Sequence, residues 1–178
     1  MPKLFIFGLG YSAGRIAREV QSLGWEVVAT GSKGKLSFDD RDAVLAELTS
    51  ATHVLSSVPP DRESGLDPVL STYGHDFAPA WYGYLSSTGV YGDAGGAWVD
   101  ESSPTGTGRR SARSDADALW MKLGARVFRL PGIYGPGRSI FERIEEGKAK
   151  RIDLPDQVFS RVHVDDIASG VVAALTGD

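Results

Sequence analysis

A buried strand, a glycine-rich loop and an amphipathic segment follow one another at the start of the chain, and this order constrains the fold more than any other feature. The run "KLFIF" (residues 3–7) is apolar apart from its first residue and is followed by a glycine, which is typical of a strand covered on both faces. In "SAGRIAREVQSLG" (residues 12–24) the apolar residues have helical spacing, and Gly24 is placed to end the helix. "WEVVAT" (residues 25–30) predicts a second buried strand. Together these segments predict a βαβ unit with parallel strands.

The alternation of strands and helices continues along the chain. Apolar runs predict further strands at residues 35–38, 52–58, 81–87 and 125–130. Amphipathic segments predict helices at residues 40–48, 65–77, 111–124, 140–148 and 165–177, and a stretch rich in Gly, Ser and Pro predicts a loop at 89–108. This pattern is typical of an α/β fold, a Rossmann-like doubly wound parallel sheet with helices on both faces. With 178 residues and no visible linker, we expect one domain spanning residues 1–178.

The glycine loop predicts a binding site for the pyrophosphate of a dinucleotide. Gly8 allows a tight turn, Gly10 allows the backbone to approach the phosphates, and a small residue at Ala13 or Gly14 allows the helix to pack closely on the strand. The helix N-terminus then offers free N–H groups and the positive end of its dipole. The alternative is that the glycines serve only a tight turn. The candidate cofactor residues of the loop are Gly8, Gly10, Tyr11, Ser12, Ala13 and Gly14.

The end of the second strand bears on the choice of cofactor. An acidic residue there would bind the ribose 2′-hydroxyl of NAD, but "ATGSKGK" (residues 29–35) has no carboxylate. Thr30, Ser32 and Lys33 are suited to a 2′-phosphate, which favours NADP over NAD, although a simple polar turn explains them almost as well. Asp39 either binds the adenine amino group or caps a helix.

Composition excludes several classes of function. The net charge of −4 disfavours a nucleic-acid-binding protein, which usually carries a basic face. The absence of cysteine excludes disulfides and thiolate chemistry, and the three histidines are too far apart in sequence for a histidine metal motif. No apolar run is long enough for a membrane span or a signal peptide. We therefore expect a cytoplasmic protein with no metal, no nucleic acid and no membrane partner.

Three later stretches resemble one family. "YLSSTGVYG" (residues 84–92), "FRLPGIYGPGRS" (128–139) and "SRVHVDDIA" (160–168) resemble the extended short-chain dehydrogenases/reductases, and in particular their bacterial NAD-dependent epimerase/dehydratase branch. The resemblance runs from residue 3 to about residue 174. It implies a Rossmann fold that binds NAD(P) at the carboxyl ends of the strands.

The resemblance also implies roles for individual residues. Ser87 takes the position of the catalytic serine or threonine, with Thr88 as its substitute; the alternative is that the serine only bonds the backbone at the strand end. The resemblance implies cofactor contacts for Ser57, Val58, Pro59 and Pro131, and substrate contacts for Tyr134, Arg138 and Arg161. Surface ion pairs are an equally good explanation of the two arginines, and packing beneath the cofactor site explains Tyr134.

The chain departs from the family at its catalytic base, a tyrosine followed four residues later by a lysine. No Tyr-x-x-x-Lys occurs anywhere in the sequence. Arg109 or Arg110, together with Arg113, occupies roughly those positions, and arginine stays protonated, so it cannot exchange a proton. Family members also carry a further C-terminal segment that covers the substrate, so we expect a truncated substrate lobe. The resemblance further implies a homodimer formed through residues 65–77 and 111–123.

Two functions remain open from the sequence. The first is an NAD(P)-dependent oxidoreductase or epimerase that acts on a small polar or nucleotide-sugar-like substrate. The alternative is a non-catalytic dinucleotide-binding protein that serves as a redox sensor or an assembly partner, which the absence of Tyr-x-x-x-Lys favours.

Overall fold

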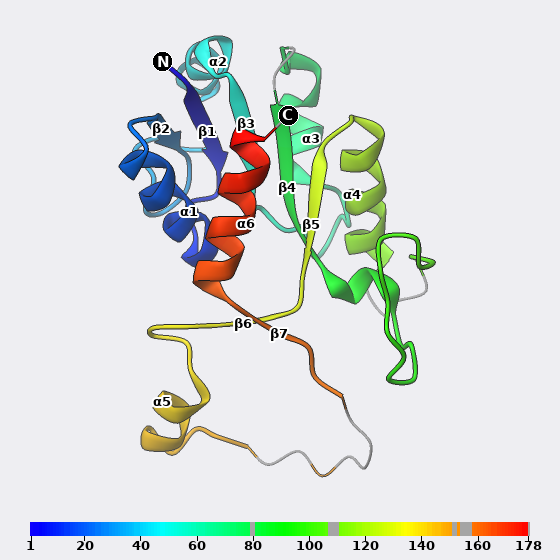
Figure 1. Cartoon of the computed structure of the whole chain (residues 1–178). Helices are drawn as coiled ribbons and strands as arrows, with labels where there is room; N and C mark the ends of the chain where they lie inside the picture. The colour runs from blue at the N-terminus through cyan, green and yellow to red at the C-terminus, as the bar shows by residue number, and fades with distance from the viewer. Residues whose placement is uncertain (79–80, 107–110, 151–152, 154–157, 178) are drawn as a thin grey trace.

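The computed structural model describes residues 1–78, 81–106, 111–150, 153 and 158–177. Its centre is a five-stranded sheet in the order β2-β1-β3-β4-β5, in which every neighbouring pair is parallel (Figure 1). The strands are β1 (Lys3–Phe7), β2 (Glu26–Ala29), β3 (His53–Ser56), β4 (Trp81–Ser87) and β5 (Arg126–Leu130). The Rossmann-like α/β class predicted from the sequence is confirmed.

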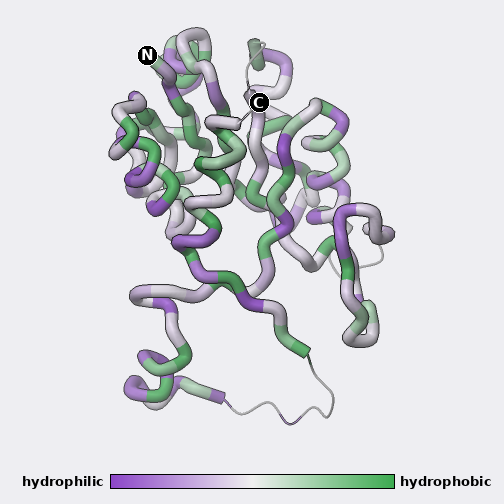
Figure 2. Tube along the Cα trace, viewed as in Figure 1, coloured by the Kyte–Doolittle hydropathy of each residue, from purple (hydrophilic) through white to green (hydrophobic). Residues whose placement is uncertain are grey.

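Helices cover both faces of this sheet because β1 is apolar on both of its faces. Leu4 and Ile6 belong to a core shared with α1 (Tyr11–Ser22) and α6 (Val164–Thr176), which lie side by side in Figure 1. Phe5 and Phe7 point to the other core, and the tube in Figure 2 is correspondingly green along β1. That second core also contains residues of α2 (Arg41–Ser50), α3 (Pro68–Tyr73) and α4 (Ser111–Lys122).

Two predicted elements were wrong in detail. Residues 35–38 are not a strand, and only an isolated bridge joins Thr30 to Leu36. A parallel neighbour of β2 would need a crossover of about a dozen residues, and the short turn at 31–35 cannot supply one. The helix predicted over 65–77 is confined to α3 and a following 3₁₀ turn, Gly74–Asp76. Pro68 occupies its first turn, and Asp67 accepts a hydrogen bond from Leu70 N at 2.9 Å, so the helix begins there.

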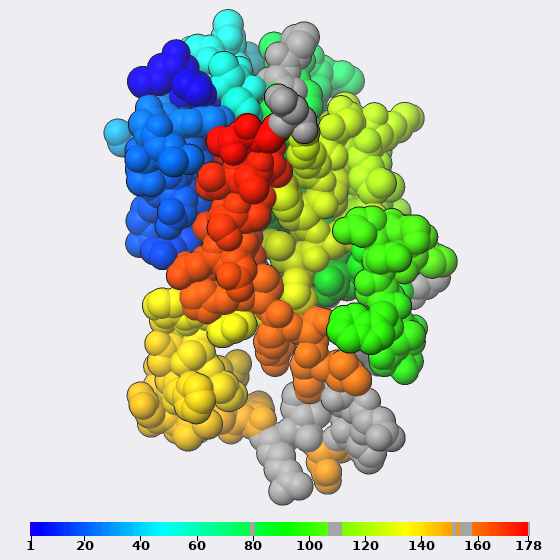
Figure 3. All heavy atoms as spheres, viewed as in Figure 1, coloured from blue at the N-terminus to red at the C-terminus, as the bar shows by residue number. Residues whose placement is uncertain are grey.

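A second, small sheet was not predicted. β6 (Gly132–Tyr134) pairs in parallel with β7 (Arg161–His163), and both strands are only three residues long. Between them lies α5 (Ile140–Glu145), which begins with a capping box made by Ser139 and Glu142. Figure 3 shows α5 at one end of the molecule, outside the body formed by the main sheet and its helices.

Candidate functional site

A cavity lies where the carboxyl ends of the main strands meet. The chain passes from β1 to β2 on one side and then to β3 on the other, so the strand order reverses beside β1. Ligands of open α/β sheets bind at such a reversal. The cavity has a volume of about 350 Å³ and is lined by Gly10, Tyr11, Ser12, Ala13, Ser57, Pro59, Leu85, Ser86, Ser87, Arg113, Leu130, Pro131, Ile133 and Arg138.

Gly8 makes the turn that opens the loop. Its φ is +83°, which disfavours other residues, and a Cβ placed on it would lie 2.9 Å from Val58 Cγ2 and 3.2 Å from Ser57 Oγ. The amide of Gly8 donates to Thr30 Oγ1 at 3.2 Å, and the hydroxyl of Ser57 donates to the carbonyl of Gly8. Gly8 therefore shapes the loop from inside the protein, and Val58 packs against it.

Gly10 faces open space instead. A Cβ placed on Gly10 meets no described atom within 4 Å. Gly10 is also the N-cap of α1, with no side-chain cap hydrogen bond and no acidic residue in the first turn. Among the described residues, no side chain accepts a hydrogen bond from the first-turn N–H groups of α1, which is the arrangement that suits an anionic ligand.

The small residue that packs closely is Ala13. Its side chain is 1% exposed and lies in the core shared by α1, α6 and the sheet. A Cβ on Gly14 meets no described atom within 4 Å, so tight packing does not explain that glycine. The sequence had left the two positions as alternatives, and the structure assigns the packing role to Ala13.

The residues after β2 divide into two groups. Thr30 is 1% exposed, accepts from Gly8 N with its hydroxyl and accepts from Leu9 N with its carbonyl at 2.8 Å. Its role is to hold the glycine loop, and it does not face solvent. Ser32 and Lys33 are exposed in the turn. Asp39 is exposed too, but the cap of α2 is Asp40, which accepts from Ala43 N at 3.2 Å.

The adjacent hydroxyls at the end of β4 point to different places. Ser87 lines the cavity of the glycine loop, and its Oγ accepts from Gly89 N at 3.1 Å. Ser86 is buried and donates to Asp117 Oδ2 at 2.6 Å. Thr88 lines a separate cavity of about 500 Å³ along β5, so it does not share the cavity of Ser87.

Sequence reasoning missed a buried network under Ser86. Arg129 donates to both carboxylate oxygens of Asp117, at 2.9 and 3.2 Å, and to the hydroxyl of Tyr91 at 3.0 Å. The hydrogen bonds that Arg129 donates to the carboxylate of Asp117 raise the pKa of Arg129, so the guanidinium stays charged. Two signals were present in the sequence: an aspartate beside Ala116 on the buried face of α4, and an arginine inside the strand "ARVFRL".

Arg113, on α4, lines the cavity of the glycine loop. It is half-buried, and its Nη1 donates to the hydroxyl of Tyr84 at 3.2 Å. Tyr84 is fully buried, and that burial raises its pKa to about 12. The other two arginines proposed for this region, Arg109 and Arg110, lie outside the described residues.

Of the three predicted substrate residues, one lines the cavity. Arg138 does so, with its guanidinium 5.4 Å from the ring centroid of Tyr11, whose hydroxyl donates to the carbonyl of Pro136. Tyr134 is 45% exposed and packs edge-on against the ring of His163. Arg161 lies over the ring of Phe159, so the cavity includes neither of these two.

His163 is the N-cap of α6. Its Nδ1 accepts from Asp165 N at 3.3 Å. The carboxylate of Asp165 forms an ion pair with Arg15 on α1 at 2.5 Å. This pair adds to the apolar contact between α1 and α6.

In the part of the chain that the structure describes, no three His, Asp or Glu side chains come together as ligands for a metal ion. None of the helices in this part is long and apolar enough to cross a membrane.

Comparison with known proteins places this geometry in a family. No family model matches the sequence, and no curated protein sequence matches it. Among solved structures, a functionally unknown conserved protein from Silicibacter pomeroyi is 38% identical, with a TM-score of 0.81 over 100% of this chain and 70% of that one. A Methylobacillus flagellatus protein assigned by name to the NAD-dependent epimerases/dehydratases is 24% identical, with a TM-score of 0.72 over 98% of this chain and 70% of its own.

A human epimerase family protein solved with NADPH is 17% identical, with a TM-score of 0.71 over 98% of this chain and 70% of that one. Likeness at these lower identities shows the shared fold, an α/β fold of the epimerase/dehydratase type. The chain belongs to the same family as the Silicibacter pomeroyi protein. It spans about 70% of the length of these three solved chains, so part of each has no counterpart in the 178 residues.

Proposed function

We propose that this protein binds a nicotinamide dinucleotide in the cavity at the carboxyl ends of β1, β3 and β4. The observation that carries the proposal is Gly10, where a side chain would meet only open space beside the uncapped N-terminus of α1. A pyrophosphate there accepts hydrogen bonds from backbone N–H groups and gains from the helix dipole. The proposal takes residues 1–178 as one domain.

The other cavity residues fit the rest of such a ligand. Ser57 and Pro59, just beyond β3, are the groups proposed to line the nicotinamide ribose, and Pro131 is proposed at the nicotinamide end. These assignments follow the family resemblance and agree with the position of all three residues on one cavity. Arg138, stacked over Tyr11 beside the loop, is proposed to face a phosphate or the substrate.

We propose NADP as the preferred cofactor. Ser32 and Lys33 are exposed in the turn after β2, and the turn has no carboxylate to bind a free ribose 2′-hydroxyl. The names of the similar solved structures do not indicate which cofactor this chain prefers, since one name includes NAD and another includes NADPH.

The proposed reaction is that of an oxidoreductase or epimerase acting on a small polar or nucleotide-sugar-like substrate. The dinucleotide, when bound, accepts or supplies a hydride. Ser87 is proposed to orient the substrate: its Oγ already accepts from Gly89 N, which leaves its own proton free to donate to a substrate oxygen. Since the sequence has no Tyr-x-x-x-Lys, the proton that accompanies hydride transfer is not assigned to that pair.

Calorimetric titration with NADPH and NADH tests the proposal on wild type and on Gly10→Val. The backbone of Gly10, at φ −88° and ψ −161°, suits any residue, so the variant should fold normally. We expect wild type to bind NADPH more tightly than NADH, and the valine, which fills the open space, to weaken binding by roughly a hundredfold, equivalent to about 2.7 kcal/mol.

Gly170→Ala on α6 is the matched control, because an added Cβ there also meets no described atom and the residue does not line the cavity. It should bind like wild type. Absence of NADPH and NADH binding by wild type would refute the proposal. Binding without turnover of any tested substrate would favour the non-catalytic alternative.

A further inference from the structure

The charge of the cavity differs from that of the molecule. The whole chain has a net charge of −4, with 23 acidic and 19 basic residues. The residues that line the cavity include two arginines, Arg113 and Arg138, and no aspartate or glutamate. The N-terminus of α1 adds the positive end of a helix dipole to the same space. The cavity therefore attracts negative charge at more than one point.

Arg138 is exposed to solvent, whereas Arg113 is half-buried. In the described part of the chain Arg113 forms no ion pair, and its one recorded polar partner is the hydroxyl of Tyr84. That partner is neutral, since the pKa of Tyr84 is raised to about 12 by burial. A guanidinium carries five N–H donors, so Tyr84 leaves most of them unused. A half-buried cation in this state is stabilised by an anion.

The buried carboxylates nearest to Tyr84 are committed to other partners. Asp117 receives hydrogen bonds from Arg129 and Ser86. Asp67 accepts from Leu70 N and from Trp120 Nε1, the latter at 2.9 Å. Neither forms a recorded hydrogen bond with Arg113. Among the described residues no carboxylate pairs with Arg113, and a ligand in the cavity has access to its side chain.

Arg113 also lies away from the place proposed for the pyrophosphate. The glycine loop follows β1, whereas Arg113 bonds to Tyr84 on β4, and β3 lies between those two strands. Two strand spacings correspond to roughly 10 Å. Ser87, three residues beyond Tyr84 on β4, lines the same cavity as Arg113. Arg113 and Ser87 therefore line one cavity, in which a single ligand can contact both.

We propose that Arg113 binds a carboxylate or phosphate group of the substrate beside Ser87, so that the substrate is an anion. The inference rests on the proposed function and narrows its substrate class. The planar guanidinium offers a two-pronged contact to either oxyanion, and the Ser87 hydroxyl is free to donate to the same ligand.

Titrations with inorganic phosphate and with acetate, at constant ionic strength, test the inference. Each anion is added to the protein alone and to the protein saturated with NADPH, which keeps the proposed pyrophosphate site filled. The backbone amide resonances of Ser87 and Gly89 report binding in every variant. The anion that binds more tightly in wild type identifies the group, phosphate or carboxylate, that the site takes.

Arg113→Gln removes the charge and keeps an N–H donor for Tyr84. We expect it to weaken anion binding at least tenfold, to change NADPH affinity less than twofold, and to leave the folded spectrum intact. Arg113→Lys keeps the charge but lacks the planar guanidinium with its paired N–H donors. Its anion affinity should lie between those of wild type and Arg113→Gln. Arg126→Gln is the control, since Arg126 lies at the opposite end of β5 over the Trp81 ring and should bind both anions like wild type.

Unchanged anion affinity in Arg113→Gln would overturn the inference, as would wild-type protein that binds neither anion. An equal loss of NADPH and anion binding would also overturn it, because it would indicate a structural role. The experiment distinguishes failure of the proposed dinucleotide site from failure of the proposed anion site at Arg113. Anion binding that depends on Arg113 in a protein that does not bind NADPH would reject the proposed function and keep the anion site.

Discussion

At the scale of single residues, the glycines of the loop look alike in the sequence and act differently in the structure. Gly8 is required by its positive φ and by the nearness of Val58 and Ser57. A Cβ on Gly10 would meet no described atom within 4 Å, and this is the basis of our proposal that a ligand occupies that space. A sequence pattern predicts both glycines, but only the neighbours of each separate a folding role from a binding role.

Tyr84 supports a prediction on pH. Burial raises its pKa to about 12 in the folded protein, against about 10 in the unfolded chain. The folded state thus holds the proton of Tyr84 more tightly than the unfolded chain does. The contribution of this proton to the free energy of unfolding is therefore complete below pH 10 and is lost as the pH rises from about 10 to about 12. We expect the free energy of unfolding to fall more steeply over that range in wild type than in Tyr84→Phe, by about 2 kcal/mol in total. Urea titrations at pH 8, 10, 11 and 12 measure the difference, and parallel curves would contradict the prediction.

At the scale of elements, α4 packs on its neighbours through polar contacts as well as through the apolar core. Three residues on one face, spaced by four and then three positions, each bond to a different neighbour: Arg113 to Tyr84, Asp117 to Arg129 and Trp120 to Asp67. This is why α4 shows only a weak amphipathic pattern in the sequence while its inner face is buried. The helix itself was predicted correctly, but its partners were not.

The Asp117–Arg129 pair supports a prediction on stability. Their side chains are 2% and 11% exposed, and removing one partner leaves a poorly solvated charge behind. We expect Asp117→Ala to reduce the free energy of unfolding by about 3–5 kcal/mol. Asp115→Ala, on the exposed side of the same helix, should change it by about 0.5 kcal/mol or less. Equal effects of the two substitutions, measured by denaturant unfolding, would show that the buried network contributes no special stability.

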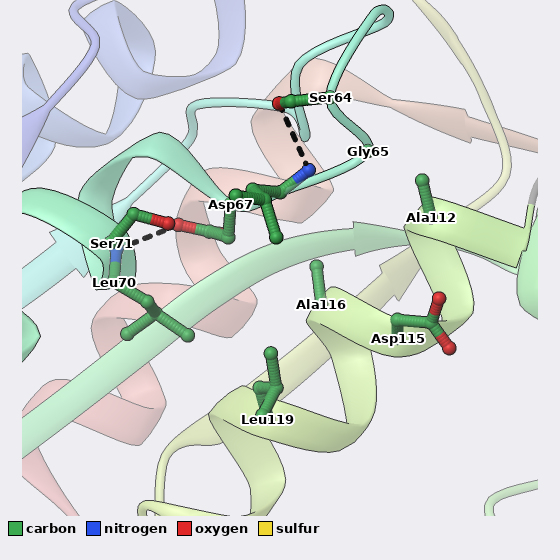
Figure 4. A pocket seen from close by; sticks show the side chains of 10 residues that line it. Ser64, Gly65, Asp67, Leu70, Ser71, Ala112, Asp115, Ala116 and Leu119 are labelled. Carbon is green, nitrogen blue, oxygen red and sulfur yellow. Dashed lines mark hydrogen bonds between the residues drawn. The ribbon is translucent and has the colours of Figure 1, made fainter.

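At the scale of the whole molecule, a cavity with exposed leucines on its rim lies between α3 and α4. Figure 4 shows the cavity between them, of about 340 Å³, with Leu70 and Leu119 pointing into it from the two sides. Leu66 and Leu119 on its rim are 60% and 49% exposed. These are the segments from which the family resemblance implies a homodimer, and we propose that dimer here.

The proposed dimer predicts the effect of a charge at its centre. Leu119→Glu should shift the protein from dimer to monomer in sedimentation equilibrium, because burying an unpaired carboxylate is costly. Leu23→Glu, at a 54% exposed leucine after α1, should leave the dimer unchanged. Wild type that sediments as a monomer at micromolar concentration would contradict the proposal.

The sequence by itself determined the strand–loop–helix start, the parallel sheet and the helices on both faces, because apolar periodicity and glycine spacing are local signals. It could not locate β6 and β7, which are too short to show a period. It also could not tell Ser87 from Thr88, because adjacent residues differ in direction only once the strand end is built.

The tertiary structure decided the remaining roles. It turned Thr30 inward to hold the glycine loop, although its sequence position suits a cofactor contact equally well. It brought Arg113, Ser87 and Gly10 to one cavity from segments far apart in the chain. Contacts between distant segments depend on the packing of whole helices and strands, and no local pattern in the sequence predicts them.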